Sequence, residues 1–104
     1  MDSWEDSTGF DWDGGNSGKN WEKYGVSDLE CEEVFFNCPL IVRHDPAHSK
    51  AEERRFRAFG QTDRGRPLFI AFTVRRNLIR IISPREMTRR ELRFYRSHEK
   101  HEET

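Results

Sequence analysis

From residue 53 onward, hydrophobic and polar positions alternate along the chain in the manner of β-strands. The segment 53–60 places Phe56 and Ala58 on one face. The segment 68–74 is apolar on both faces, so we expect it at the centre of a sheet, covered on both sides. Residues 78–82 continue the pattern after a turn. Together these segments predict a meander of antiparallel strands.

Helical periodicity precedes the predicted strands. Residues 19–24 are expected to form a short helix that stops at Gly25, because glycine readily adopts the left-handed conformation of a helix end. Ser27 and Glu30 have the spacing of a capping box, so a second helix should begin there. We expect Pro39 to end it. The core-facing stripe of this second helix consists of Cys31, Val34, Phe35 and Cys38.

A third helix is expected near the C-terminus. Ser83 can cap it, Pro84 suits the first helical position, and Glu86 completes a second capping box. We expect this helix to run to about Ser97. Short extended segments are expected at residues 10–13 and 40–42, and a loop at 45–49.

The order of these elements predicts an α+β domain. Two N-terminal helices and a C-terminal helix are expected to pack on one face of a mainly antiparallel, three- to four-stranded sheet. The 104 residues are enough for one domain, which we place at 10–97. The acidic, turn-rich residues 1–9 are expected to form a flexible arm, and the polar residues 98–104 a frayed tail.

Charge is distributed unevenly along the chain. Residues 1–33 carry ten acidic side chains and two lysines, whereas residues 54–93 carry twelve arginines and three acidic side chains. Arginine binds phosphate well because its planar group offers several donors and stays charged. Such a cluster indicates a nucleic-acid binder, although a surface of mutual salt bridges is the open alternative.

Other classes of protein fit poorly. No apolar run is long enough for a membrane span and no signal segment is visible, so we expect a cytoplasmic protein. Two cysteines are too few for a disulfide framework. The spacing of the four candidate zinc ligands matches no known zinc finger, so neither a metal nor a cofactor is expected. These candidate ligands are Cys31, Cys38, His44 and His48.

Several short motifs occur in an order that resembles the BrnT family of toxins from type II toxin–antitoxin systems. The resemblance covers roughly residues 10–95. Its most specific part is Arg80-Ile81-Ile82-Ser83-x-Arg85, followed by Glu91-x-x-x-Tyr95. The other motifs are Phe10-x-Trp12-Asp13, Asn20-x-x-Lys23-x-Gly25-Val26, Val34-Phe35, Glu53-x-Arg55, Gly60 and Gly65-Arg66.

The resemblance implies a RelE-like fold and a ribonuclease that inhibits translation. It also implies a small BrnA-like antitoxin, of the ribbon-helix-helix type, that binds both the toxin and operator DNA. Two positions depart from the family pattern, because Asn16 replaces the usual lysine and Tyr24 the usual histidine. These departures leave open a second possibility, a catalytically silent module that binds its partner without cleaving RNA.

RNA cleavage without a metal needs a proton acceptor, a proton donor and positive charge at the reacting phosphate. Arg80 and Arg85 are the best candidates to stabilise charge, and Arg85 is expected at the entrance of the third helix. Arg55 is expected on the same sheet surface and could contribute to the site. The open alternative is a structural ion pair with Glu53 or Glu91. Tyr24 is the candidate for proton transfer. The predicted RNA-binding residues are Lys23, Arg57, Arg76 and Arg89.

Overall fold

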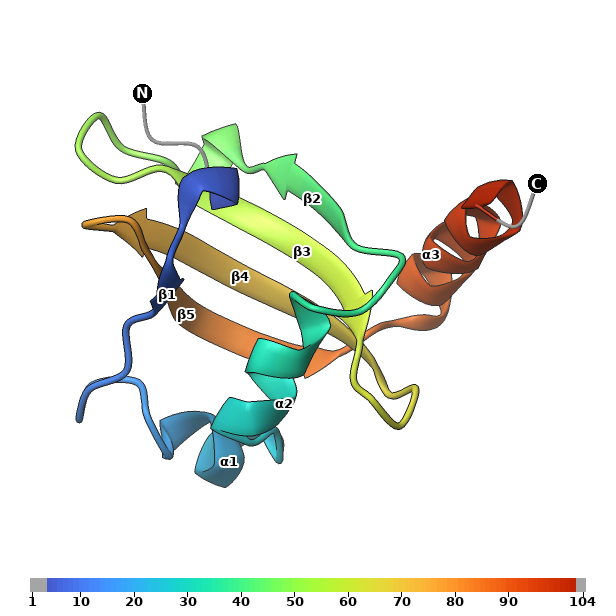
Figure 1. Cartoon of the computed structure of the whole chain (residues 1–104), viewed down its shortest axis with the longest axis horizontal. Helices are drawn as coiled ribbons and strands as arrows, with labels where there is room; N and C mark the ends of the chain where they lie inside the picture. Colours follow the sequence, from blue (N-terminus) through green and yellow to red (C-terminus); the bar gives the residue numbers. More distant parts are fainter. Residues whose placement is uncertain (1–3, 103–104) are drawn as a thin grey trace.

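The structure is a computed structural model that describes residues 4–102. It contains a five-stranded sheet with the strand order β1-β5-β4-β3-β2 (Figure 1). β1 runs parallel to β5, and the other neighbouring strands are antiparallel. The strands are β1 (Gly9–Phe10), β2 (Ile41–His44), β3 (Arg55–Gln61), β4 (Pro67–Arg75) and β5 (Leu78–Glu86). The helices are α1 (Lys19–Tyr24), α2 (Asp28–Val34) and α3 (Arg89–Glu102), with 3-10 turns η1 (Trp4–Asp6) and η2 (Pro46–His48).

The predicted α+β class is confirmed, but the sheet has five strands and is mixed. β4 lies at its centre, as the apolar character of both faces predicts. The extended segment expected at 40–42 becomes the edge strand β2, paired with β3. The strand expected at 10–13 is wrong beyond Phe10, because the chain turns there and the carbonyl of Asp13 accepts a bond from the Ser17 backbone N–H.

The helices cover both faces of the sheet, so the prediction that they share one face is wrong. α1 and α2 lie together over one face, whereas α3 stands apart at one end of the sheet (Figure 1). The Phe94 ring of α3 lies 5.3 Å from the Phe59 ring. Phe59 alternates along β3 with Ala58, whose side chain belongs to the core under α1 and α2. The core residues are Val26, Cys31, Val34, Phe56, Ala58, Leu68, Ile70, Phe72, Ile79 and Ile81.

The capping box predicted at Ser83 and Glu86 is wrong, because β5 continues through both residues. Pro84 pairs with Ile70 in a part of β5 that has β4 as its described strand neighbour, and proline is tolerated at such an edge. The equivalent bonds form five residues later. The Thr88 hydroxyl accepts the Glu91 backbone N–H, and the Glu91 carboxylate accepts that of Thr88. α3 therefore starts at Arg89 and passes the predicted end at Ser97.

The two N-terminal helices follow their predicted starts more closely. α1 ends before Gly25, which has a φ of 67°, and both capping-box bonds between Ser27 and Glu30 are present. α2 ends at Val34, however, so Cys38 is not part of its core stripe and is exposed. After α2 the chain turns through residues 35–39 and enters β2 at Ile41.

The segment 1–9, predicted to be a flexible arm, contacts the core from Trp4 onward. The Trp4 and Phe72 rings meet edge-on at 6.5 Å, and the Thr8 backbone N–H donates to the carbonyl of Asn77. Residues 1–3 and, in the tail, residues 103–104 lie outside the described residues. The flexibility of both ends stays a prediction.

Gly60 lets α2 approach β3. A Cβ atom at Gly60 would lie 2.6 Å from Cγ1 of Val34, which is closer than real Cβ contacts. We predict that Gly60→Ala lowers the free energy of unfolding by about 1–3 kcal/mol, the usual cost of overpacking. Urea denaturation of the variant and of Gly14→Ala measures this cost, because a Cβ at Gly14 meets nothing within 4 Å. Equal midpoints for the two variants would contradict the prediction.

Candidate functional site

The face of the sheet opposite α1 and α2 carries arginines at neighbouring positions. Arg43 of β2 pairs with Arg57 of β3, and both alternate with residues of the core face. Further along, Phe69 of β4 pairs with Arg85 of β5. We define the basic face as Arg43, Arg55, Arg57 and Arg85. The antiparallel register thus gathers on one surface arginines that are far apart in the sequence.

An open groove of about 470 Å³ lies between the basic face and α3. Its lining residues are Arg43, Arg57, Phe59, Thr88, Arg90, Glu91 and Phe94. The Arg43 guanidinium lies 5.8 Å from the centroid of the Phe94 ring, within the range of a cation–π contact. Among the described side chains, Arg43, Arg57 and Arg90 have no carboxylate at ion-pair distance. The groove therefore combines uncompensated positive charge with aromatic surface.

Arg85 joins α3 to the sheet. Its guanidinium donates to both Glu91 carboxylate oxygens, at 2.7 and 2.9 Å, and lies 4.2 Å from the Phe69 ring centroid. The bond from Arg85 outweighs burial and, with the Thr88 backbone N–H, holds the pKa of Glu91 below its usual value. Arg85 lies on β5 and not at a helix entrance, because α3 starts later than predicted. It borders the groove through Glu91.

Arg80 is held by the loop that follows β1. It donates to both carboxylate oxygens of Asp13, at 3.0 and 3.1 Å, and lies 3.5 Å from Asp11. The Arg80 bond, with a bond from the Gly15 backbone, lowers the pKa of Asp13. The side chain of Arg80 is only 15% exposed and is not part of the groove lining.

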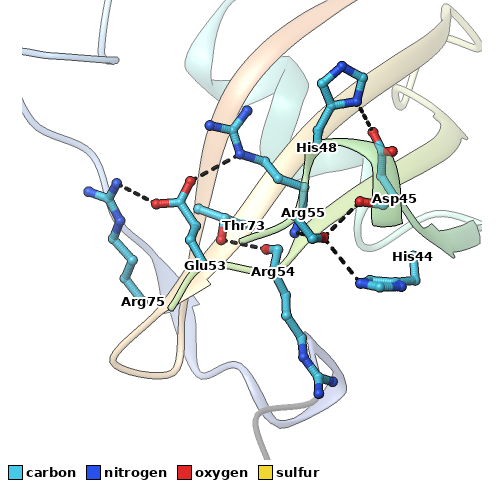
Figure 2. Close-up of polar contacts among 9 residues, drawn as sticks. His44, Asp45, His48, Glu53, Arg54, Arg55, Thr73 and Arg75 are labelled. Atoms are coloured by element: carbon cyan, nitrogen blue, oxygen red, sulfur yellow. Dashed lines mark hydrogen bonds and ion pairs between the residues drawn. The ribbon is translucent and has the colours of Figure 1, made fainter. Parts of the chain in front are cut away.

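Arg55 shares a carboxylate with a neighbouring strand. Glu53 accepts from Arg55 and from Arg75 of β4, at 3.0 Å each (Figure 2). The bond from Arg75, opposed by burial and supported by Arg55, lowers the pKa of Glu53. The ion pair with Glu53, one of the alternatives left open for Arg55, is therefore present. Arg57 is the residue of the predicted site that lines the groove directly.

The remaining predicted RNA-binding residues are spread over the surface. Lys23 lies in the last turn of α1, Arg76 lies in the β4–β5 turn with a φ of 53°, and Arg89 begins α3. All three are exposed, and none lines the groove. Four residues that line the groove were not predicted from the sequence: Arg43, Phe59, Arg90 and Phe94. The pairing of 41–44 with 56–59 would reveal Arg43, but a four-residue strand carries little register information of its own.

One protein-family model matches most of this chain. The model described as "Ribonuclease toxin, BrnT, of type II toxin-antitoxin system" matches residues 12–91. The chain belongs to the BrnT family. The matched region contains α1, α2, four strands of the sheet and the first residues of α3, so it includes most of the groove lining. No curated protein matches the chain.

The first departure from the usual BrnT pattern, Asn16, is a structural residue here. It is 5% exposed, and its side-chain oxygen accepts the backbone N–H of Asp13 at 2.8 Å. Its side-chain nitrogen donates to the carbonyl of Asp11 at 2.9 Å and, more weakly, to that of Ile81 at 3.5 Å. Asn16 thus fastens the loop that holds Arg80 to β5.

The second departure, Tyr24, lies on the other side of the sheet from the groove. Its ring packs against the core residues that α1 and α2 cover, with the Lys23 ammonium 5.4 Å from the ring centroid. The structure therefore does not bring Tyr24 together with Arg57 or Arg85.

Of the helices within residues 4–102, none has the length and apolar character needed to cross a membrane. In the same part of the chain, no cluster of three or more His, Cys, Asp or Glu side chains is placed to hold a metal ion. Cys31 is buried, and burial, with the nearby charges of three acidic side chains, raises the pKa of its thiol to about 12.

We predict that Glu91→Gln lowers the free energy of unfolding at pH 7 by about 1 kcal/mol, the usual contribution of a helix cap. Because the folded-state pKa of Glu91 is lowered, its carboxylate stabilises the fold above the unfolded pKa, near 4.5. This contribution is lost as the pH falls through the folded-state pKa. Urea denaturation should therefore show a smaller difference between variant and wild type at acidic pH.

The matched control is Glu52→Gln, which changes an exposed carboxylate without an ion pair among the described residues. A Glu91→Gln effect that is independent of pH would contradict the role of the ionised carboxylate.

Proposed function

We propose that this chain is a cytoplasmic toxin with a RelE-like fold that inhibits translation by cleaving RNA. Membership of a family of ribonuclease toxins supports this proposal. The observation that carries it is the groove, in which Arg43, Arg57 and Arg90 have no carboxylate at ion-pair distance among the described side chains. Arginines in a concave site attract phosphates, and nucleotide bases stack on exposed aromatic rings.

RNA would bind with its backbone along the basic face. The guanidinium of Arg57 would contact the phosphate and stabilise the charge that develops on it during cleavage. Arg85 would join this contact only by exchanging one of its bonds to Glu91 for a phosphate oxygen. Arg55 and Arg80 would support the site from its borders, and their carboxylate partners hold them in place. Lys23, Arg76 and Arg89 remain candidates for more distant phosphates. No step in this scheme requires a metal.

A second candidate function is a catalytically silent module that binds its antitoxin without cleaving RNA. The ion pairs of Arg55, Arg80 and Arg85 favour it, since each predicted charge stabiliser already has a carboxylate partner. The location of Tyr24 across the sheet favours it too. The two functions differ in one measurable respect: the silent module forms the antitoxin complex normally but leaves RNA intact.

We predict that induced expression of the wild type arrests growth and degrades cellular RNA. Arg57→Ala should relieve this arrest because it removes the phosphate contact at the centre of the groove. For the purified protein, losing one such contact should reduce the salt dependence of single-stranded RNA binding by about 0.7 in log–log slope. Arg80→Ala should also relieve arrest, because it releases the loop after β1 that Asp13 joins to β5. Arg85→Ala should do so because it removes the bond to Glu91 that positions α3.

Arg64→Ala is the matched control, because Arg64 is an exposed arginine in the β3–β4 turn and does not line the groove. This variant should arrest growth like the wild type. Intact RNA and normal growth with soluble wild-type protein would rule out the ribonuclease and leave the silent module.

We further propose that the antitoxin, a BrnA-like protein of the ribbon-helix-helix type, covers the basic face. It would link the toxin to operator DNA. An acidic or amphipathic segment laid on this face would neutralise its charge. We predict that added salt slows formation of the complex, and that Arg43→Ala or Arg57→Ala reduces this salt sensitivity. Stopped-flow association rates test this. Rates that ignore both salt and these two arginines would contradict it.

A further inference from the structure

A histidine–aspartate pair lies at the edge of the basic face. The ring nitrogen Nδ1 of His48, in η2, is 2.9 Å from Oδ2 of Asp45 (Figure 2). An ionised carboxylate can only accept a hydrogen bond, so Nδ1 carries the proton. In the neutral ring, Nε2 then has a free lone pair. The side chain of His48 is 72% exposed while that of Asp45 is 15% exposed, so the partner is anchored and the histidine faces solvent.

The backbone around this pair is fastened to β3. The Asp45 backbone N–H donates to the Arg55 carbonyl at 2.8 Å, and the Arg55 N–H donates to the Ser49 hydroxyl at 2.9 Å. The Ser49 hydroxyl in turn donates to the Asp45 carbonyl at 2.7 Å. These three bonds close the turn on both sides of His48. The position of the histidine is thus set by the strand that carries Arg57.

The pair does not line the groove, but Asp45 lies within electrostatic range of Arg57, which does. Burial disfavours the ionised form of Asp45, but the bond from His48 and the charges of His48 and Arg57 lower its pKa. Arg57 therefore acts on both the Asp45 carboxylate and the groove that it lines. In Figure 2 the side chains of His48 and Arg55 extend to the same side, while Arg54 extends the opposite way. His48 therefore lies on the side of β3 to which Arg55 of the basic face extends.

We propose that His48 is the catalytic proton acceptor of this ribonuclease and that Asp45 is its positioning residue. This role rests on the proposed function. Histidine exchanges protons readily near neutral pH. A carboxylate on Nδ1 fixes the ring orientation and stabilises the imidazolium that forms. His48 would thus supply the proton transfer that neither Asn16 nor Tyr24 provides at the basic face.

The chemical step is an internal transfer on the RNA chain. Nε2 of His48 takes the proton of a 2′-hydroxyl group, and the 2′-oxygen attacks the adjacent phosphorus atom. The bond from phosphorus to the 5′-oxygen breaks, and that oxygen leaves as a 5′-hydroxyl after taking a proton from water. The imidazolium then returns its proton to the resulting hydroxide. The products are a 2′,3′-cyclic phosphate and a 5′-hydroxyl end.

Other described histidines fit the role less well. Because the single hydroxyl proton of Ser49 goes to Asp45, His44 uses Nε2 to donate to Ser49, at 3.2 Å. The His44 ring also lies against Phe56, a residue of the core face. His98 of α3 donates from Nδ1 to the Phe94 carbonyl at 3.0 Å, and that partner carries no charge to stabilise an imidazolium. Both provide matched controls.

The test compares purified full-length variants on total bacterial RNA, with and without translating ribosomes. We expect His48→Ala to reduce the cleavage rate by about 10²-fold or more, within the usual contribution of a general base. His98→Ala should cleave within a few-fold of the wild type, and His44→Ala, which loses the 3.2 Å bond to Ser49, should lose far less activity than His48→Ala. Asp45→Asn should lower kcat with little change in KM, whereas Arg57→Ala should both raise KM and lower kcat. Because the site is exposed, added imidazole should restore part of the His48→Ala activity, which a folding defect would not allow.

The outcomes separate the two proposals. Loss of cleavage in His48→Ala with active controls, and a 2′,3′-cyclic phosphate on the wild-type products, support the role of His48. Cleavage by His48→Ala at the wild-type rate, or a loss confined to His98→Ala, overturns that role and leaves the ribonuclease function in place. A folded wild-type protein that cleaves RNA under neither condition overturns both.

Discussion

The apolar character of β4 on both faces is the constraint on which the rest of the structure depends. Its core-facing residues lie under α1 and α2, and Phe69 on the other face packs against Phe59 and supports Arg85. A strand that is apolar on both sides needs cover on both sides, so the helices cannot share one face. α3 covers only one end of the second face. The basic groove is what remains open between this partial cover and the β2–β3 edge.

Carboxylates divide the arginines of the chain into two groups. Asp13, Glu53 and Glu91 lie on different segments, and each fixes an arginine that also connects two elements. Of the three, only Asp13 belongs to the acidic segment 1–33, which also contributes Glu30 as a partner of Arg66. Such partly exposed pairs contribute modestly to stability, and their main effect is on geometry. The arginines of the groove have no carboxylate at ion-pair distance among the described side chains, so their donors remain available to an anion.

The sequence predicted correctly those features whose signal lies in a few neighbouring residues. The end of α1, the capping box at Ser27 and the central position of β4 are of this kind. A capping box was predicted at Ser83, whereas the structure forms one at Thr88, and strand pairing decides between the two positions. Residues up to Glu86 pair with β4, so the strand extends through the first box. The groove was harder to predict, because Arg43 and Arg57 meet only through the register of a four-residue edge strand.

The same strand explains why a loop histidine is suited to chemistry that depends on position. Loops usually carry functional groups with less precision than sheets do, unless a rigid scaffold holds them. Here the side chain of Arg57, on β3, lines the groove. The backbone of Arg55, on the same strand, bonds to both ends of the turn that contains His48. A phosphate bound at Arg57 and a proton acceptor at His48 would therefore share one rigid reference. Tyr24 packs on the core side of the sheet and shares no such reference with the groove.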